Sequence, residues 1–190
     1  GLIHRIDKDT SGLLLVARHT ASYQQLVRAM AARAISRTYE AVASGVLIAG
    51  DTINAAIARD PRQRTRMRID VNGRQAVTHF RIAARYRRHT LLEVHLETGR
   101  THQIRVHLAS IGHPLVGDSR YGARPRPPLG ASASLIAQLE QFPRQALHAA
   151  RLQLEHPVSG ETLTFHDPRP DDLNRLIEAL AADTQGVGQQ

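Results

Sequence analysis

The spacing of hydrophobic residues changes several times along the first part of the chain, and each change predicts a different element. The continuous apolar run at 12–17 is typical of a strand buried on both faces. From Thr20, a residue type that caps helices, to Ala34, apolar residues recur at helical spacing. The expected buried stripe comprises Tyr23, Leu26, Val27, Met30 and Ala31. The stretch 35–46 is rich in β-branched and aromatic residues and predicts another strand.

Strands also account for much of the remaining pattern. The arginine-rich stretch after Gly50 predicts short strands and loops. Residues 76–85 and 92–96 alternate apolar with more polar positions, as antiparallel strands with one face on the core do. Segments 147–154 and 163–165 predict two more strands.

Three further helices follow from the 3.6-residue period. The first opens after Thr101 as N-cap and ends at Gly112 as C-cap, and the second follows a proline-rich surface loop at 125–128. Their expected buried stripes are Ile104, Leu108 and Ile111, then Leu135, Ile136, Leu139 and Phe142. A proline and two aspartates at 170–172 favour the start of a last helix.

Together these elements predict the fold class. Strands interspersed irregularly with helices, mostly in alternating patterns, indicate an α+β fold with a mixed, mainly antiparallel sheet flanked by helices. With 190 residues and 42% hydrophobic positions, the chain has the size and composition of one domain. We expect that domain to cover 1–183 and the polar tail 184–190 to be disordered.

Composition narrows the classes of function. The chain has no cysteine, which excludes a disulfide framework, a thiolate zinc site and a thiol nucleophile. It has no apolar run near the roughly 20 residues that span a bilayer, and its start does not resemble a signal peptide. We therefore expect a cytoplasmic protein with no membrane partner.

The charge of the chain points to a polyanion. The formal net charge is +8, and Lys8 is the one lysine among 25 basic residues. Arginine makes forked contacts to phosphate and stacks on bases. Because the arginines cluster at 59–68, 85–88 and 124–126, the pattern predicts a nucleic-acid surface, although any single arginine fits an ordinary solvated position equally well.

Three stretches, 4–11, 37–39 and 98–107, hold more polar residues than folding requires. In the first, basic neighbours favour the ionised form of Asp7, and an ionised carboxylate serves as nucleophile or charge stabiliser. An equally simple interpretation makes Asp7 a turn cap. Tyr39, in the second stretch, also fits an ordinary core tyrosine with a satisfied hydroxyl.

The third stretch places basic residues at the expected start of a helix, a position that favours anions. Arg105 lies beside the buried face of that helix and can pair with a carboxylate. Three nearby histidines, His102, His107 and His113, are five and six residues apart and do not share one helix face. No cysteine or close carboxylate completes a ligand set, so we expect no metal site.

Four segments in order resemble a known family. Residues 4–14, His-Arg-Ile-Asp-Lys-Asp-Thr-Ser-Gly-Leu-Leu, resemble the nucleophile motif of the RNA pseudouridine synthases that include the large-subunit ribosomal enzymes. Residues 38–42 resemble the tyrosine motif of that family and 96–107 its arginine motif, and the run 111–122 continues the match. Long motifs in a fixed order are far more specific than one short pattern.

The resemblance implies the pseudouridine synthase catalytic fold and a reaction without cofactor or metal. The implied enzyme extrudes a uridine, with Asp7 as nucleophile, Tyr39 against the base and Arg105 paired with Asp7. The resemblance of 122–128 and 144–149 to members that modify large-subunit ribosomal RNA implies that RNA, or the pre-ribosomal large subunit, as partner of a monomer. The expected RNA contacts are Arg5, which we expect to enter the RNA, and Lys8, Arg59, Arg64, Arg66, Arg100, His102, Arg124 and Arg126.

The chain departs from the family pattern at its start. It opens with Gly1, without the family's segments ahead of the aspartate motif and without an S4-like RNA-binding domain. We therefore expect a fragment without the N-terminal strands that complete the sheet and cleft. Ile6, where the family usually has leucine, is a mild apolar change.

Two other classes fit the same residues. A non-catalytic RNA-binding or ribosome-assembly module would keep the basic surface, and the replacement Asp7→Asn would leave its activity unchanged. A hydrolase, for example a nuclease using Asp7 and histidines around a metal, would lose activity with a chelator and cleave RNA.

Overall fold

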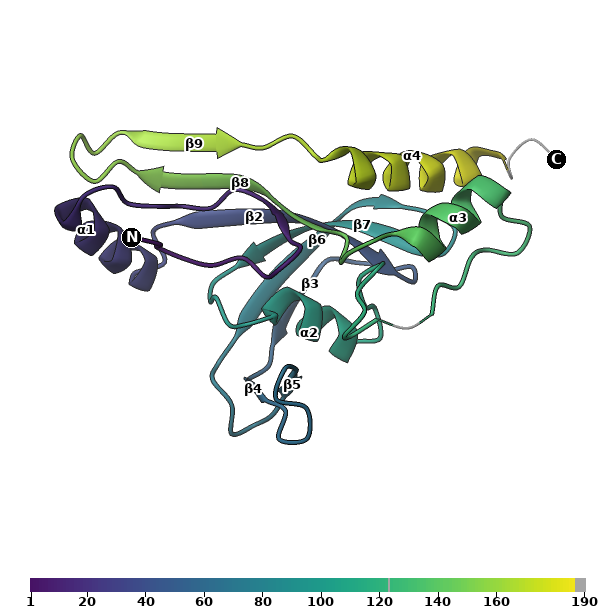
Figure 1. The fold of residues 1–190 in the computed structure, drawn as a ribbon, viewed down its shortest axis with the longest axis horizontal. Helices are drawn as coiled ribbons and strands as arrows, with labels where there is room; N and C mark the ends of the chain where they lie inside the picture. The colour runs from purple at the N-terminus through teal and green to yellow at the C-terminus, as the bar shows by residue number, and fades with distance from the viewer. Residues whose placement is uncertain (123, 187–190) are drawn as a thin grey trace.

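The computed structural model describes residues 1–122 and 124–186, which are arranged around one large sheet (Figure 1). The seven-stranded sheet has the order β1-β8-β2-β7-β6-β3, with β9 also pairing with β8. Its strands are β1 (Ser11–Gly12), β2 (Ser36–Ser44), β3 (Asp51–Asn54), β6 (Val77–Arg85), β7 (His89–Leu96), β8 (Leu147–Glu155) and β9 (Thr162–His166). β1 pairs with β8 in parallel and the other pairings are antiparallel, so the predicted mixed, mainly antiparallel sheet is confirmed.

In the described part of the chain, a small hairpin and four helices surround this sheet. The hairpin consists of β4 (Ile57–Arg59) and β5 (Met67–Ile69) and lies below α2 in Figure 1. The helices are α1 (Thr20–Ala31), α2 (Gln103–Ser110), α3 (Ala133–Gln141) and α4 (Asp171–Gly186). Successive residues of a strand face opposite sides of a sheet, and here the two sides belong to different cores. Ala41 and Leu92 pack with α2, whereas Val42 and Leu91 pack with α3 and α4.

The expectation of a strand buried on both faces at 12–17 is wrong. Gly12 is the last paired residue of β1, while Leu14 and Val16 are 42% and 52% exposed. Leu13 and Leu15 pack against the small core under α1. The segment lies at the sheet edge beside β8, where one of its faces packs against the core under α1 and the other faces solvent.

The helix starts and ends also differ from prediction. In α1 the N-cap is His19 rather than Thr20, the helix ends at Ala31 rather than near Ala34, and Leu26 is the one fully buried member of the expected stripe. In α2 the N-cap is His102, not Thr101. Because α1 covers only the sheet edge, most of its apolar side chains stay partly exposed.

The tail expectation needs a correction at residues 184–186, which continue α4 instead of being disordered. Two contacts hold this end of the helix: the Thr184 hydroxyl donates to the Leu180 carbonyl at 2.9 Å, and Asp183 pairs with Arg87 at 3.2 Å. Residues 187–190 lie outside the described part of the chain. Within the described part, every helix is too short or too polar to cross a membrane.

We predict a pH-dependent stability from His89, which is buried at the start of β7. Burial, with the nearby charge of Arg88, lowers its pKa to about 4, against the opposing influence of Asp183. As the pH falls, the imidazole of His89 takes up a proton in the unfolded chain before it does so in the folded protein. The stability that the neutral His89 contributes to the fold is therefore fully present above pH 6.5 and is lost as the pH falls from 6.5 towards 4. The loss amounts to at most about 3 kcal/mol.

Urea unfolding at pH 7 and at pH 4.5 checks this prediction. The free energy of unfolding of His89→Gln should fall less on acidification than that of the original chain. Replacement of the exposed His19 should leave the fall between pH 7 and pH 4.5 the same as in the original chain. Equal losses in the His89→Gln variant and the original chain would contradict the assignment.

Candidate active site

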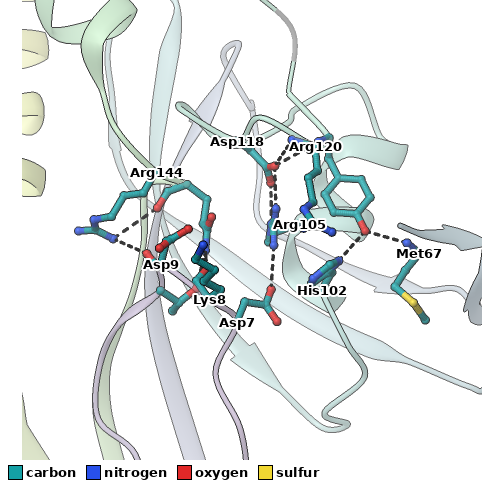
Figure 2. Close-up of polar contacts among 12 residues, drawn as sticks. Asp7, Lys8, Asp9, Met67, His102, Arg105, Asp118, Arg120 and Arg144 are labelled. Carbon is teal, nitrogen blue, oxygen red and sulfur yellow. Dashed lines mark hydrogen bonds and ion pairs between the residues drawn. The ribbon is translucent and has the colours of Figure 1, made fainter. Parts of the chain in front are cut away.

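The loop that carries Asp7 is fixed by the chain just before β8. The side-chain amide of Gln145 donates to the Lys8 carbonyl at 2.7 Å and to the Thr10 hydroxyl at 2.9 Å. Arg144 donates to the Asp9 carbonyl at 3.2 Å (Figure 2). Asp9 itself has a left-handed backbone with φ 67°, which short polar residues tolerate better than most. The loop therefore presents Asp7 from a defined turn.

Gly12 allows this loop to reach β8. Its φ is +108°, and a Cβ there would lie 2.3 Å from the carbonyl oxygen of Ala149. We expect Gly12→Ala to lower the free energy of unfolding by about 2–4 kcal/mol, because the clash adds to the cost of the backbone conformation. The matched control is Gly112→Ala, which has φ +83° but open space around its Cβ position. Gly112→Ala should lower the free energy of unfolding by about 1–2 kcal/mol. If thermal or urea unfolding shows equal losses for the two variants, the Gly12 position involves no clash.

Asp7 is joined to Arg105, and Arg105 to a second carboxylate. Arg105 Nη1 donates to Asp7 Oδ2 at 3.2 Å, while Nε and Nη2 donate to the two oxygens of Asp118 at 2.7 and 2.9 Å. The paired hydrogen bonds to Asp118 have the forked geometry in which arginine binds a carboxylate most strongly. Figure 2 shows the three side chains in a row, so Arg105 reaches Asp7 from a fixed position.

The electrostatics of Arg105 and Asp118 favour their charged forms. Burial alone would raise the pKa of Asp118, but hydrogen bonds and charge from Arg105, with two backbone amides, keep it below its ordinary value. Burial opposes the charge of Arg105, yet Asp118 and Asp7 together raise its pKa. The pair of Arg105 and Asp118 is therefore ionised at neutral pH.

Tyr121 connects Arg105 to the β4–β5 hairpin. Its hydroxyl accepts from the Met67 amide at 2.8 Å and lies 2.7 Å from His102 Nδ1 (Figure 2). The guanidinium groups of Arg105 and Arg66 lie 5.1 and 5.2 Å from the centre of its ring, a cation–π arrangement. Burial lowers the pKa of His102, whose left-handed backbone has φ 56°. The arginine-rich hairpin is thus in direct contact with the residues behind Asp7.

Tyr39 comes from the middle of β2 and reaches the same place. The register shift between β2 and β8 at this point places an extra residue, Ala150, on β8, whereas β2 pairs with β7 without interruption. Tyr39 therefore shares a face of β2 with Ala41 and Ala43. Burial, and the charge of Asp7, raise the pKa of Tyr39 against the opposing influence of Arg37, so its hydroxyl stays neutral. Tyr39 and Asp7 border a hollow, the Asp7 cleft, whose lining also includes Arg5, Arg37 and Arg100.

The predicted RNA contacts fall into separate groups. Arg5 and Arg100 line the Asp7 cleft, and Lys8 is exposed on the loop beside it. Arg59 and Arg100 border a neighbouring hollow at the β4–β5 hairpin. Arg64 and Arg66 lie in the loop that joins the two strands of this hairpin. Arg124 and Arg126 instead line a different hollow with Arg88 and His89. The structure therefore brings the first two groups together around Asp7 and leaves the third apart.

Asp118 and Arg37 belong to this site but were not predicted as site residues. Asp118 lay within a segment that carried the family resemblance, but no spacing indicated that it would meet Arg105. Arg37 lay in a polar stretch, and no pattern indicated that its side chain would be buried beside the cleft. Within residues 1–122 and 124–186, no three His, Asp or Glu side chains are grouped closely enough to hold a metal ion.

Comparisons with known proteins agree with this geometry. Residues 1–110 match the family model described as RNA pseudouridylate synthase. The chain is 51% identical to the ribosomal large subunit pseudouridine synthase D of Haemophilus ducreyi, over 97% of this chain and 57% of that protein. It is 54% identical to the protein of the same name from Salmonella typhimurium, over 96% of this chain and 56% of that protein.

A solved structure shares the fold. Human RNA pseudouridylate synthase domain containing 1 superposes with a TM-score of 0.73 at 27% identity, covering 95% of this chain and 80% of that one. The chain spans a little over half the length of the curated relatives it matches. The family model covers more than half of the chain, and the chain therefore belongs to the RNA pseudouridylate synthase family.

Proposed function

We propose that this protein converts uridine to pseudouridine in large-subunit ribosomal RNA. The observation that carries the proposal is the Asp7 cleft, in which a carboxylate held by Arg105 lies beside the buried Tyr39 and several arginines. The two bacterial relatives are named for this activity on the large ribosomal subunit. Family membership supports the same chemistry here.

The reaction exchanges one glycosidic bond for another. The bond from ribose C1′ to N1 of uracil breaks, the base turns, and C1′ bonds to C5, while N1 gains a proton and C5 loses one. No oxidant or reductant is needed for this balance. A target base must first leave its stack, at a cost of a few kcal/mol.

The side chains of the cleft match these needs. Asp7 is our candidate nucleophile, because Arg105 holds one carboxylate oxygen while the other makes no hydrogen bond within the described residues. The neutral Tyr39 offers a ring and a hydroxyl to the extruded base, and we propose that it contacts that base. Arg105 keeps the Asp7 carboxylate oriented towards the cleft.

The RNA contacts are proposed in the same way. Arg5 enters the RNA and fills the gap left by the base, while Lys8, Arg59, Arg64, Arg66, Arg100 and His102 contact the RNA around the cleft. Arg124 and Arg126 contact a more distant part of it. The proposed setting is the cytoplasm, with ribosomal RNA or the pre-ribosomal large subunit as partner of a monomeric protein.

An RNA transcript of the large subunit tests the function. The protein is incubated with the transcript in the presence of a chelator, and pseudouridine is mapped by chemical labelling and primer extension. We expect modification at defined uridines in intact RNA. Cleaved RNA would favour a hydrolase, and RNA that is bound but unmodified would favour a non-catalytic module; either result would overturn the proposal.

A further inference from the structure

Arg37 is a buried arginine at the edge of the Asp7 cleft. The residue is 8% exposed and lies two positions before Tyr39 on β2, so both side chains leave the strand on the same face. Arg37 lines the Asp7 cleft and also a neighbouring groove of about 930 Å³, the side groove, which borders α1 and includes His4, Arg33 and Glu97. Its guanidinium therefore lies at the junction of two hollows.

Among residues 1–122 and 124–186, this buried cation has no anionic partner. No ion pair within the described residues includes Arg37, and its Nε is enclosed without a hydrogen-bond acceptor. Two acids that line the same hollows as Arg37 pair with other side chains: Asp7 with Arg105, and Glu97 with Arg33 and His79. Burial lowers the pKa of the neighbouring His4, and the positive charge of Arg37 lowers it further.

Burying a charge without a partner is costly, and arginine does not escape the cost by losing its proton. The surroundings accommodate the group all the same. A Cβ on Gly99 would lie 3.0 Å from Arg37 Nη1, so a glycine leaves room for the guanidinium. Such an arrangement is expected where a ligand supplies the missing negative charge.

We propose that Arg37 binds a phosphate of the RNA backbone next to the extruded nucleotide. The inference rests on the proposed function for the identity of the nucleic acid. A phosphodiester carries the missing charge and offers two oxygens to the arginine fork. The junction of cleft and groove suits this role, because a base in the Asp7 cleft leaves its own backbone at the cleft mouth. Phosphate contacts of this kind position the chain without reading its sequence.

The variant Arg37→Met distinguishes a role of Arg37 in RNA binding from a role in stabilising the fold. The variant should bind the RNA hairpin that contains the modified uridine about tenfold more weakly, with a salt slope reduced by about one contact. Its melting temperature should stay unchanged or rise, because a buried unpaired charge has been removed. A lowered melting temperature with unchanged RNA affinity would overturn the proposal. Arg37→Lys, which keeps the charge but not the fork, should bind RNA with intermediate affinity.

The control is Arg169→Met. Arg169 pairs with Glu40 at 2.7 Å, and Glu40 extends from the opposite face of β2 to Tyr39. This change should lower the melting temperature and leave the RNA affinity within about twofold.

A series of RNA hairpins, each with one neutral methylphosphonate, locates the contact. One position next to the modified uridine should weaken binding to the original protein about tenfold and have little effect on Arg37→Met. If every position weakens both proteins equally, Arg37 binds no phosphate. The readout is affinity, so a protein that binds RNA without modifying it would still test Arg37, while the labelling assay separately decides the function.

Discussion

Asp7→Asn should abolish pseudouridine formation while leaving RNA affinity within about threefold of the original value, because affinity comes mainly from arginine contacts to phosphate. Asparagine has the same shape and can still accept the hydrogen bond from Arg105 Nη1 through its carbonyl oxygen. It lacks the negative oxygen that the proposed chemistry requires. We expect the single-turnover rate to fall on the order of 10⁴-fold or more.

The matched control is Asp9→Asn, two residues away on the same loop. Asp9 is exposed, and its left-handed backbone is one that asparagine also tolerates. The rate of this variant should stay close to that of the original protein. A comparable loss in both variants would assign the effect to the charge of the loop rather than to Asp7.

Asp118→Ala should be the most destabilising change within the site. The Asp118 side chain is fully buried, and its loss would leave Arg105 with a single bond to Asp7. Breaking a buried pair by removing one partner costs about 3–5 kcal/mol, since the other charge stays buried. The backbone amides of Arg120 and Tyr121 would also lose their acceptor.

Urea unfolding measures this loss, and Asp70→Ala provides the comparison. Asp70 pairs with Arg68 at 2.6 Å on the surface of the hairpin, where solvent screens the charges, so its replacement should cost far less. If both variants unfold at the same urea concentration, the buried pair does not contribute as proposed.

The sequence predicted the elements better than their limits. β6 and β8 were predicted to within one residue at each end. β7 was predicted only from residue 92 although it begins at His89, because its first four residues are buried on both faces and show no alternation. The run at 12–17 was misread because a continuous apolar pattern does not reveal whether a strand has cover on both faces. The cap of α2 was misplaced because His102 adopts a left-handed backbone, which no cap rule anticipates.

Some residues of the site were predicted from the sequence and others were not. The family motifs marked Asp7, Tyr39 and Arg105, and the structure brings them to one place, although their roles in the reaction stay predictions. Asp118 depends on where α2 lies relative to the following turn, and the burial of Arg37 depends on its approach to Gly99. Such contacts arise from packing between distant segments, and a single sequence does not show them.

The loss of the C5 hydrogen provides the most direct test of the central claim. Large-subunit ribosomal RNA transcript with tritium at C5 of uridine is incubated with the protein and with Asp7→Asn, and tritium released into water is followed over time. We expect one tritium released for each pseudouridine formed by the original protein and no release by Asp7→Asn. No release by the original protein, or equal release by both, would contradict the central claim.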